Sequence, residues 1–320
     1  EFVAPVIQEM GGRSETPDVL VEGRMPFRFA SEKGRTEYVL VSLVTSDRPG
    51  VTPTAYPIGK GSGSVTTFSR ADGFVTIPRQ QEFLDEGELV EVRLLGRGIT
   101  PVDLVAIGSH CVGLDLLLGT LRSEGIRSKV MNVGSSAGLT AARRGECDLA
   151  GVHLYDRESG TYNEPFVTEE VELVRGYDRI QGIVHRPGDP RFTGESLDET
   201  IERLKGDPEC VMVNRNRGSG TRALIDELLD GAKPDGYSVD AKSHHAVAAA
   251  VAQRRADWGV CIETVAGDAG LAFIPVREER YDFLVPRSRL SREPVRRFIE
   301  ALDSDEMRGR LRERGFRVPS

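Results

Sequence analysis

The order of apolar and polar positions divides the chain into two regions with different periodicity. In the first region the apolar runs are short and strand-like, at residues 38–44 (YVLVSLV), 73–78 (GFVTIP) and 88–95 (ELVEVRLL). Turn-rich segments such as SDRPGVTP and YPIGKGSGS separate them. Several short strands in so small a region predict an all-β barrel or sandwich.

Beyond the run Gly96-Arg97-Gly98, strand-like runs alternate with amphipathic helix-like runs. Residues 102–110 (VDLVAIGSH) predict a strand that ends in a Gly-Ser turn, and residues 113–125 predict the helix that follows. Such alternation predicts an α/β domain with a parallel sheet and ligand-binding loops at the carboxyl ends of its strands. We therefore expect two domains, residues 1–98 and 99–320. The same alternation continues at residues 128–138, 139–146, 148–154, 171–188, 197–206, 210–229, 244–263, 281–286 and 294–304.

Composition and charge narrow the classes of protein that fit. Hydrophobic residues make up 39% of the 320 positions, which is enough for packed cores. The net charge of −8 disfavours a nucleic-acid partner, and no apolar run is long enough to predict a membrane span. The opening EFVAPVIQEMGG has neither a Met nor the pattern of a signal peptide. We expect a cytoplasmic fragment of a longer protein.

The cysteines and histidines do not predict a metal site. The four cysteines, Cys111, Cys147, Cys210 and Cys261, lie far apart without a CxxC pair, as is typical of free buried thiols in a reducing compartment. His244 and His245 are adjacent, which is poor spacing for two ligands on one helix face.

Three Ser-rich turns are the candidate ligand site. Each turn follows a predicted strand and precedes a predicted helix, so each offers backbone N–H groups, hydroxyls and the positive end of a helix dipole. No lysine follows the glycines of NRGSGTR, which excludes a nucleotide-binding P-loop. Such donors suit a tetrahedral oxyanion, although Ser residues at these positions are also ordinary helix caps. The candidate ligand residues are Ser109, His110, Ser135, Ser136, Arg217, Ser219, Thr221 and Arg222.

No catalytic residues are predicted from the sequence. Residues 134–138 (GSSAG) match the weak pattern G-x-S-x-G, but no order of Ser, Asp and His accompanies them. Residues 155–165 (YDRESGTYNEP) are expected to form a surface loop, with a loop over the cleft as the alternative.

Residues 33–44 (KGRTEYVLVSLV), 55–78 (AYPIGKGSGSVTTFSRADGFVTIP) and 84–95 (LDEGELVEVRLL) resemble the C-terminal β domain of the MoeA/gephyrin-E molybdopterin molybdenumtransferases. Residues 1–12 resemble the tail of that family's preceding catalytic domain. The resemblance implies a domain at the edge of a pterin-phosphate pocket, with Lys60, Ser62 and Ser64 bordering it, and a homodimer as an assembly to test. An ordinary Gly-rich hairpin loop is the alternative for these three residues.

The second region resembles the periplasmic-binding-protein-like domains, including tungstate- and molybdate-binding proteins. The residues that carry the resemblance are IGSHC (107–111), NVGSSAGLTAARRGECDLAGVHL (132–154), NRGSGTR (216–222) and HAVAAAVAQRRADWGV (245–260). It implies an α/β fold of type II with two lobes, a hinge of two crossing segments and a ligand between the lobes. The effector domains of LysR-type regulators share this fold.

Together the two resemblances imply a C-terminal fragment of a molybdenum-cofactor biosynthesis protein. Its binding domain would capture or sense molybdate or tungstate for insertion into molybdopterin. The alternatives are a sensor for the pterin cofactor or another anion, and the solute-binding domain of a transporter. Metal insertion would belong to the catalytic domain missing before residue 1, so this chain alone is expected to bind no covalent cofactor and to insert no metal.

Overall fold

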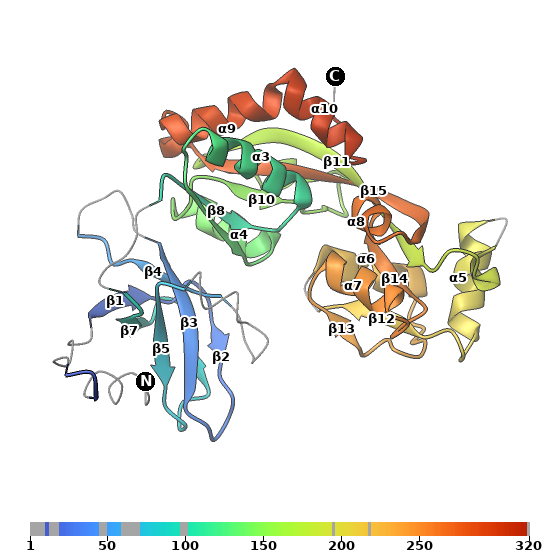
Figure 1. Cartoon of the computed structure of the whole chain (residues 1–320), viewed down its shortest axis with the longest axis horizontal. Helices are drawn as coiled ribbons and strands as arrows, with labels where there is room; N and C mark the ends of the chain where they lie inside the picture. The colour runs from blue at the N-terminus through green and yellow to red at the C-terminus, as the bar shows by residue number, and fades with distance from the viewer. Residues whose placement is uncertain are drawn as a thin grey trace. The chain divides into compact units, whose positions relative to one another are not determined.

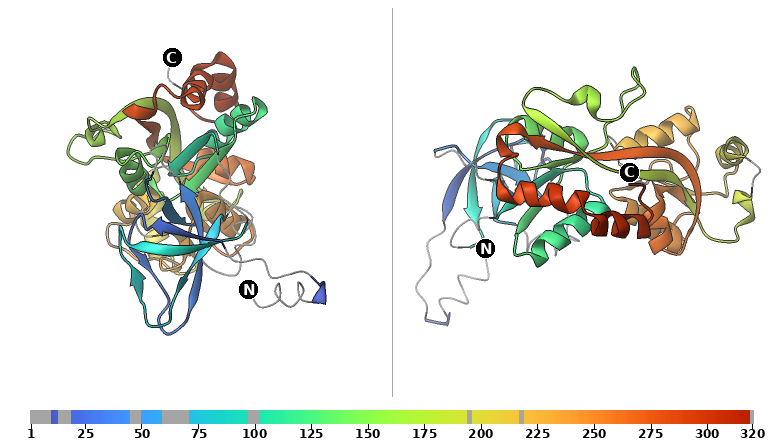
Figure 2. Two further views of the ribbon diagram at one scale, coloured as in Figure 1. Left: turned by 90° about the vertical axis from the view of Figure 1, so that its left-hand side faces the viewer. Right: turned by 90° about the horizontal axis from the view of Figure 1, so that it is seen from above.

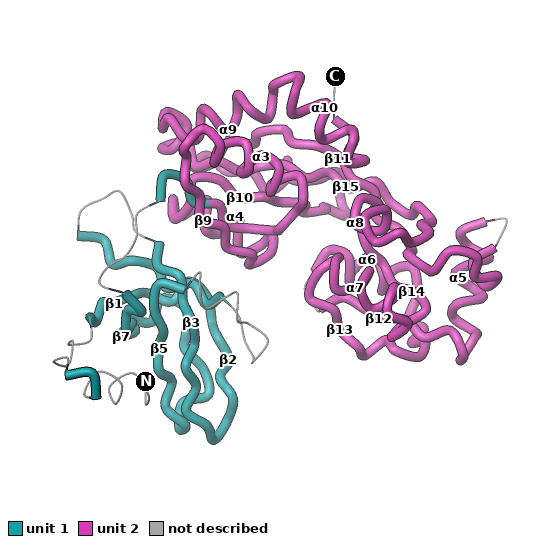
Figure 3. The backbone as a smooth tube through the Cα atoms, in the orientation of Figure 1, with its two compact units in different colours: residues 1–105 teal, residues 106–320 magenta. Residues whose placement is uncertain are grey.

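The structure, a computed structural model, describes residues 10–12, 19–44, 50–58, 71–96, 102–193, 196–216 and 219–318. The chain divides into two compact units, Glu1–Val105 and Ala106–Ser320 (Figure 3). Within these described ranges, no helix has both the length and the apolar character needed to cross a membrane.

The first unit is a closed β barrel, as the strand-like runs predict. Buried positions alternate with more exposed ones along β5 and β7, so one side of each strand faces the barrel core. Val41, Ile77 and Val92 are completely buried there, with branched side chains that pack well on a pleated surface. Lys60, Ser62 and Ser64 lie outside the described residues. Around the barrel the order is β1 (Leu20–Arg24), β4 (Thr54–Pro57), β3 (Glu37–Val44), β5 (Gly73–Ile77) and β7 (Leu89–Leu94), while β2 (Phe29–Ala30) pairs with β6 (Phe83–Leu84).

The main sheet of the second unit is mixed, whereas the alternating pattern predicted a parallel one. Only β14 with β12 and β12 with β13 are parallel; the remaining neighbours are antiparallel. The sheet is mixed because β11 and β15, which are neighbours in it, run in opposite directions and pair along their length. The order of the sheet is β10 (Ala150–Val152), β15 (Ala272–Pro286), β11 (Val171–His185), β14 (Trp258–Ile262), β12 (Met212–Arg215) and β13 (Asp240–Ala241).

Strands β11 and β15 run through both lobes of this unit (Figures 1 and 2). Their pairing extends from Val171↔Pro286 to His185↔Ala272. Strand β10 pairs beside one end and β14 beside the other. The two-lobed α/β architecture preceded by a β barrel is therefore confirmed. The first lobe also holds β8 (Leu104–Gly108), α3 (Val112–Ser123), β9 (Ser128–Asn132), α4 (Ser135–Arg143), α9 (Glu293–Asp303) and α10 (Asp305–Glu313); the second holds α5 (Leu197–Gly206), α6 (Gly220–Leu229), α7 (His244–Ala252) and α8 (Glu263–Asp268).

The helices pack through the apolar stripes that their sequences predict. Leu114, Leu117 and Leu121 of α3 lie on one face at helical spacing and are buried. The helix predicted at residues 294–304 corresponds to α9, and a further helix, α10, follows it. Ser304 lies between the two helices and caps α10 by accepting a hydrogen bond from the N–H of Met307. Three short 3-10 turns, Glu164–Phe166, Pro190–Phe192 and Arg287–Arg289, lie between the larger elements.

Close backbone packing of glycines sets the geometry of the first lobe at the end of β8. A Cβ atom on Gly108 would lie 2.5 Å from the carbonyl oxygen of Gly151, and one on Gly138 would lie 2.7 Å from the Cα of Gly108. Gly108 also has a φ of +156°, which L side chains rarely adopt. Only glycine lets β8, α4 and β10 approach so closely, and this approach places Ser109, Ser135 and His153 next to one another.

Candidate functional site

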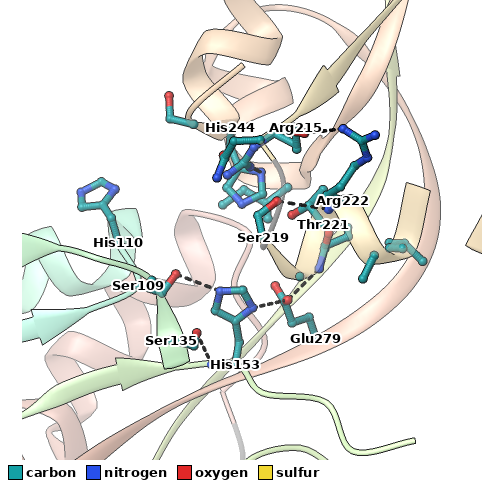
Figure 4. A pocket seen from close by; sticks show the side chains of 18 of the residues that line it. Ser109, His110, Ser135, His153, Arg215, Ser219, Thr221, Arg222, His244 and Glu279 are labelled. Atoms are coloured by element: carbon teal, nitrogen blue, oxygen red, sulfur yellow. Dashed lines mark hydrogen bonds and ion pairs between the residues drawn. The ribbon is translucent and has the colours of Figure 1, made fainter. Parts of the chain in front are cut away.

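A cleft of about 1050 Å³ lies within the second unit and is lined by residues of both lobes (Figure 4). The first residues of four helices, α3, α4, α6 and α7, lie on its wall. A helix N-terminus presents unpaired N–H groups and a partial positive charge, so four of them around one cleft favour a negatively charged ligand.

The turns predicted to hold a ligand come together in this cleft. Arg217 lies outside the described residues, and the structure adds no information about its position. The binding role of the other candidates stays a prediction. Those that line the cleft are Ser109, His110, Ser135, Ser136, Ser219, Thr221 and Arg222.

Two of the serine hydroxyls keep a hydrogen that a ligand can accept. Ser219 caps α6 by accepting from the N–H of Arg222 at 3.2 Å, and Ser135 accepts from the N–H of His153 at 3.1 Å. In both bonds the serine oxygen is the acceptor, so the O–H remains a donor. The cap and ligand roles that the sequence left as alternatives are therefore compatible at Ser219.

Arg222 and His110 are occupied by protein partners. The guanidinium of Arg222 is buried and donates to Asp226 at 2.9 Å and to Asp240 at 3.2 Å. It also donates to the carbonyl oxygen of Arg215 at 3.1 Å, so it ties the first turn of α6 to the end of β12. Nε2 of His110 lies 2.7 Å from Asp115.

Arg215, at the end of β12, is a cleft residue that the sequence analysis did not select. The residue is 8% exposed, and its guanidinium donates to Nδ1 of His244 at 3.0 Å. It forms no ion pair with a carboxylate of the described residues, and its Nε has no hydrogen-bond partner among them. Burial first, and then the charge of Arg179, lower the pKa of Arg215 to about 10, which leaves it protonated at neutral pH.

The charges that line the cleft leave an excess of positive charge. Each of its carboxylates is paired with an arginine: Asp226 with Arg222, Glu227 with Arg277, and Glu279 with Arg179. In the part of the chain that the structure describes, no such ion pair forms for the cleft residues Arg157, Arg215 and Lys242. The cleft is thus electropositive although the whole chain carries a net charge of −8.

His153 and Glu279 form a buried hydrogen-bonded chain beneath Ser109 (Figure 4). Nε2 of His153 lies 2.8 Å from Oγ of Ser109, and its Nδ1 lies 2.6 Å from Oε1 of Glu279. Nε of Arg179 donates to Oε2 of Glu279 at 2.6 Å, and Gln181 donates to Oε1 at 2.6 Å. Burial alone would raise the pKa of Glu279, but the charges and hydrogen bonds of Arg179 and His153 lower it to about 2.

Ser109, His153 and Glu279 have the connectivity of a nucleophile, a base and a carboxylate, which the sequence did not reveal. Arg179 shares the carboxylate, and its charge offsets the stabilisation that Glu279 gives to an imidazolium. The chain of hydrogen bonds is therefore better suited to fixing the tautomer of His153 than to activating Ser109.

Sequence position offers a signal for His153 but none for Glu279. His153 directly follows β10, and the rule that ligand residues follow strands applies to it as it does to the serine turns. Glu279 lies inside β15, 126 residues later, and reaches the cleft only because β15 spans both lobes.

The cysteines form no disulfide in the described part of the chain: all four are buried as free thiols, and Cys111 is among the residues that line the cleft. No group of three or more His, Cys, Asp or Glu residues suited to hold a metal ion occurs in the described ranges.

Comparison with known proteins identifies both parts of the chain. Residues 119–303 match the family described as the PBP superfamily domain, and residues 22–95 match the MoeA C-terminal region (domain IV). The uncharacterized protein YvgK of Bacillus subtilis (strain 168) is 30% identical over 188 residues, which are 56% of this chain and 58% of that protein. The chain therefore spans less than two thirds of that relative.

Solved structures share the fold of the second unit. An ABC-type phosphate transport receptor from Vibrio cholerae matches with a TM-score of 0.50 and 17% identity, over 68% of this chain and 100% of that one. A putative phosphate ABC transporter substrate-binding protein from Clostridium perfringens, with bound phosphate, matches with a TM-score of 0.55 and 15% identity, over 68% and 99%. With the PBP superfamily match covering more than half of its length, the chain belongs to the PBP superfamily domain family and carries a MoeA C-terminal region before that domain.

Proposed function

We propose that the second unit binds a small tetrahedral oxyanion, molybdate or tungstate, and captures or senses it in the cytoplasm for insertion into molybdopterin. The observation that carries this proposal is Arg215, a buried cation in the cleft wall without a carboxylate partner among the described residues. Leaving a buried charge uncompensated is costly, so an anion that enters the cleft gains the interaction that the protein leaves open.

The cleft that contains Arg215 also offers neutral hydrogen-bond donors. The hydroxyls of Ser135 and Ser219 and the first turn of α6 line the same cleft, and each offers a hydrogen without adding a charge that must be desolvated. One buried cation together with several neutral hydrogen-bond donors can bind a tetrahedral dianion. The two solved proteins of this fold are a phosphate transport receptor and a substrate-binding protein with bound phosphate, and phosphate is also a tetrahedral oxyanion, which supports this ligand class.

Among tetrahedral oxyanions, the MoeA C-terminal region favours molybdate or tungstate as the ligand. A domain of this kind in the same chain as an oxyanion-binding cleft would link the supply of the metal oxyanion to the enzyme that consumes it. Lys60, Ser62 and Ser64 would border the pterin pocket of the whole protein, and metal insertion itself would belong to its catalytic domain.

The test is calorimetric titration of the full chain with molybdate, tungstate, sulfate and phosphate. We expect molybdate or tungstate to bind the wild type most tightly. Arg215→Gln should raise Kd roughly tenfold to more than a hundredfold, because a hydrogen bond to a charged group contributes about 1.5–3 kcal/mol.

The matched control is Arg277→Gln, which removes an arginine of the same cleft that is already paired with Glu227 at 2.5 Å. We expect its Kd to stay within about threefold of the wild type, since such half-exposed ion pairs contribute little. If no oxyanion binds at millimolar concentration, or if both variants weaken binding equally, Arg215 does not define an oxyanion site.

A second candidate ligand is a phosphorylated pterin, which two observations favour. The cleft volume of about 1050 Å³ lies just above the range of roughly 300–1,000 Å³ typical of pockets for larger organic ligands. Tyr155 and Tyr162 also line the cleft with ring centroids 5.0 Å apart, and Arg277 lies over Tyr155 at 5.6 Å. A planar ring could stack there while its phosphate reaches Arg215.

Tyr155→Ala separates the two candidates. For a pterin ligand the substitution should weaken binding of a phosphorylated pterin by about tenfold, the scale of one aromatic stacking contact. For a small oxyanion the affinity should not change, because the tyrosine pair is not needed to bind four oxygens. Tighter binding of the pterin than of any free oxyanion by the wild type would make it the ligand.

A further inference from the structure

The tautomer of His153 is fixed by its partners. Glu279 is ionised, and both of its oxygens accept hydrogen bonds from protein donors, Oε1 from Gln181 and Oε2 from Arg179. An ionised carboxylate can only accept, so Nδ1 of His153, 2.6 Å from Oε1, carries a hydrogen in either charge state of the ring. Any change in the protonation of His153 therefore takes place at Nε2.

The protonation state of Nε2 of His153 determines whether the Ser109 hydroxyl can donate a hydrogen bond to a ligand. In the neutral ring Nε2 is an acceptor, and at 2.8 Å it takes the only hydrogen of the Ser109 hydroxyl. Ser109 then turns lone pairs toward the cleft, which repel an oxyanion that has no hydrogen of its own. When Nε2 is protonated it donates to Oγ, and the Ser109 hydrogen becomes free to bind the ligand.

Opposite charges lie beside the ring of His153. The carboxylate of Glu279 contacts Nδ1, and the guanidinium of Arg179 pairs with the same carboxylate. The N-terminus of α6 also approaches the ring: a Cβ atom placed on Gly220 would lie 3.4 Å from Nδ1. A bound dianion adds two negative charges to this balance. The titratable and charged groups beside the ring are Glu279 and Tyr281 of β15, Arg179 of β11 and His244 of α7. Arg215 of β12 and His110, which follows β8, line the same cleft.

His244 is the other ring that could take a proton when an anion binds. Its Nδ1 accepts a hydrogen bond from Arg215, so a second proton on that ring requires the bond to break. Nε2 of His153 can be protonated without the loss of a hydrogen bond, because the Ser109 hydroxyl turns from donor to acceptor.

We infer that a fully ionised tetrahedral dianion binds this cleft together with one proton, which is held on Nε2 of His153. His153 is thereby the residue that sets the preference between ionised and hydrogen-bearing anions. The inference rests on the proposed oxyanion site. An anion with its own hydrogen, such as hydrogen phosphate, donates that hydrogen to Ser109 and needs no proton from solution.

The experiment is calorimetric titration of the full chain with tungstate at pH 8 in two buffers of different ionisation enthalpy. The dependence of the binding heat on the buffer gives the number of protons taken up. We expect about one proton per tungstate and none per hydrogen phosphate, and a Kd for tungstate that rises about tenfold per pH unit in the alkaline range.

Two variants locate the proton. His153→Gln places an amide N–H near the position of Nε2, so tungstate should bind without proton uptake and with an affinity that does not change with pH. His245→Gln, at an exposed histidine on the rim of the same cleft, should keep the uptake of one proton. The ¹⁵N chemical shifts of histidine in the wild type check the assignment independently of any variant: Nε2 of His153 should become protonated when tungstate is added.

The outcomes separate the two proposals. Tungstate binding without proton uptake, or uptake that His153→Gln does not abolish, would overturn the role of His153 and leave the oxyanion site intact. If tungstate, molybdate and phosphate all produce neither heat nor a shift in melting temperature at pH 6 and pH 8, both the site and the inference are wrong.

Discussion

At the residue scale, two cleft arginines that lie close together in the sequence have different roles. Arg222 is held by Asp226 and Asp240 and ties α6 to the end of β12, while Arg215, seven residues earlier, has a histidine as its partner. The sequence NRNRGSGTR offers three arginines without indicating which of them is paired. The answer depends on Asp240 and His244, which approach only when the second lobe folds.

His244 is predicted to make stability depend on pH. Burial, followed by the charges of Arg215 and Arg179, lowers its pKa well below the ordinary value. As pH falls below about 6.5 the unfolded chain takes up a proton that the folded ring does not, so stability is lost toward acid. In anion-free buffer the wild type should lose up to about 1.4 kcal/mol per pH unit relative to His244→Gln.

Urea denaturation between pH 7.5 and 5 measures this difference. His245→Gln, at the exposed adjacent position, controls for the loss of a histidine from α7. Parallel pH profiles for the wild type and His244→Gln would mean that the ring is protonated in the folded protein.

At the element scale, helix N-termini both shape the cleft and stabilise the fold. Ser219 caps α6 at the cleft, and Ser196 caps α5 away from it, in a capping box with Glu199. The local geometry is alike: each hydroxyl accepts from a backbone N–H three residues later at 3.2 Å. Only the Ser219 hydrogen can reach a ligand in the cleft.

Ser219→Ala and Ser196→Ala form a matched pair. Each should lower the free energy of unfolding by about 1 kcal/mol, the usual cost of losing a serine cap. Only Ser219→Ala should also weaken oxyanion binding, by roughly tenfold or more. Thermal unfolding and calorimetric titration of both variants test this. Equal affinities for the two would reduce Ser219 to a structural cap.

Helices and strands were predictable from the sequence where they follow from the local spacing of apolar residues. They were not predictable where a strand is stabilised by residues far away in the sequence. The α3 stripe and the alternating strands of the barrel follow from spacing alone. Strand β15 was predicted only at residues 281–286, because the charged residues Arg277, Glu279 and Arg280 before it suggest a loop. In the structure Glu227, Arg179 and Glu164 pair with them, so a charged segment is stable inside a strand. No nearby residue indicates those partners.

At the scale of the whole molecule, the barrel and the second unit have separate apolar cores. The barrel core is built from Val41, Ile77, Val92 and their neighbours, and the cores of the second lobe contain none of these residues. Composition and periodicity predicted a change near Gly96–Thr100, and independent folding of the two parts stays a prediction.

Residues 102–320 expressed alone should therefore fold, unfold cooperatively and keep the oxyanion affinity of the full chain. The physical reason is that every described residue of the cleft lies between Ser109 and Glu279. Circular dichroism, thermal melting and titration with tungstate test this. A shortened chain that aggregates, or that loses affinity more than about threefold, would show that the barrel supports the cleft.

The antiparallel pairing of β11 and β15 has a mechanical consequence. The first lobe contains both β8, which leads into the second unit, and α10, near its end, so the second lobe is an insertion carried on a two-stranded ribbon. A pulling force between residues 104 and 313 would load the first lobe, while the second would bear tension only after the ribbon had begun to unzip. The second lobe, which carries Arg215, therefore lies off the path of the force and is protected from strain transmitted along the chain.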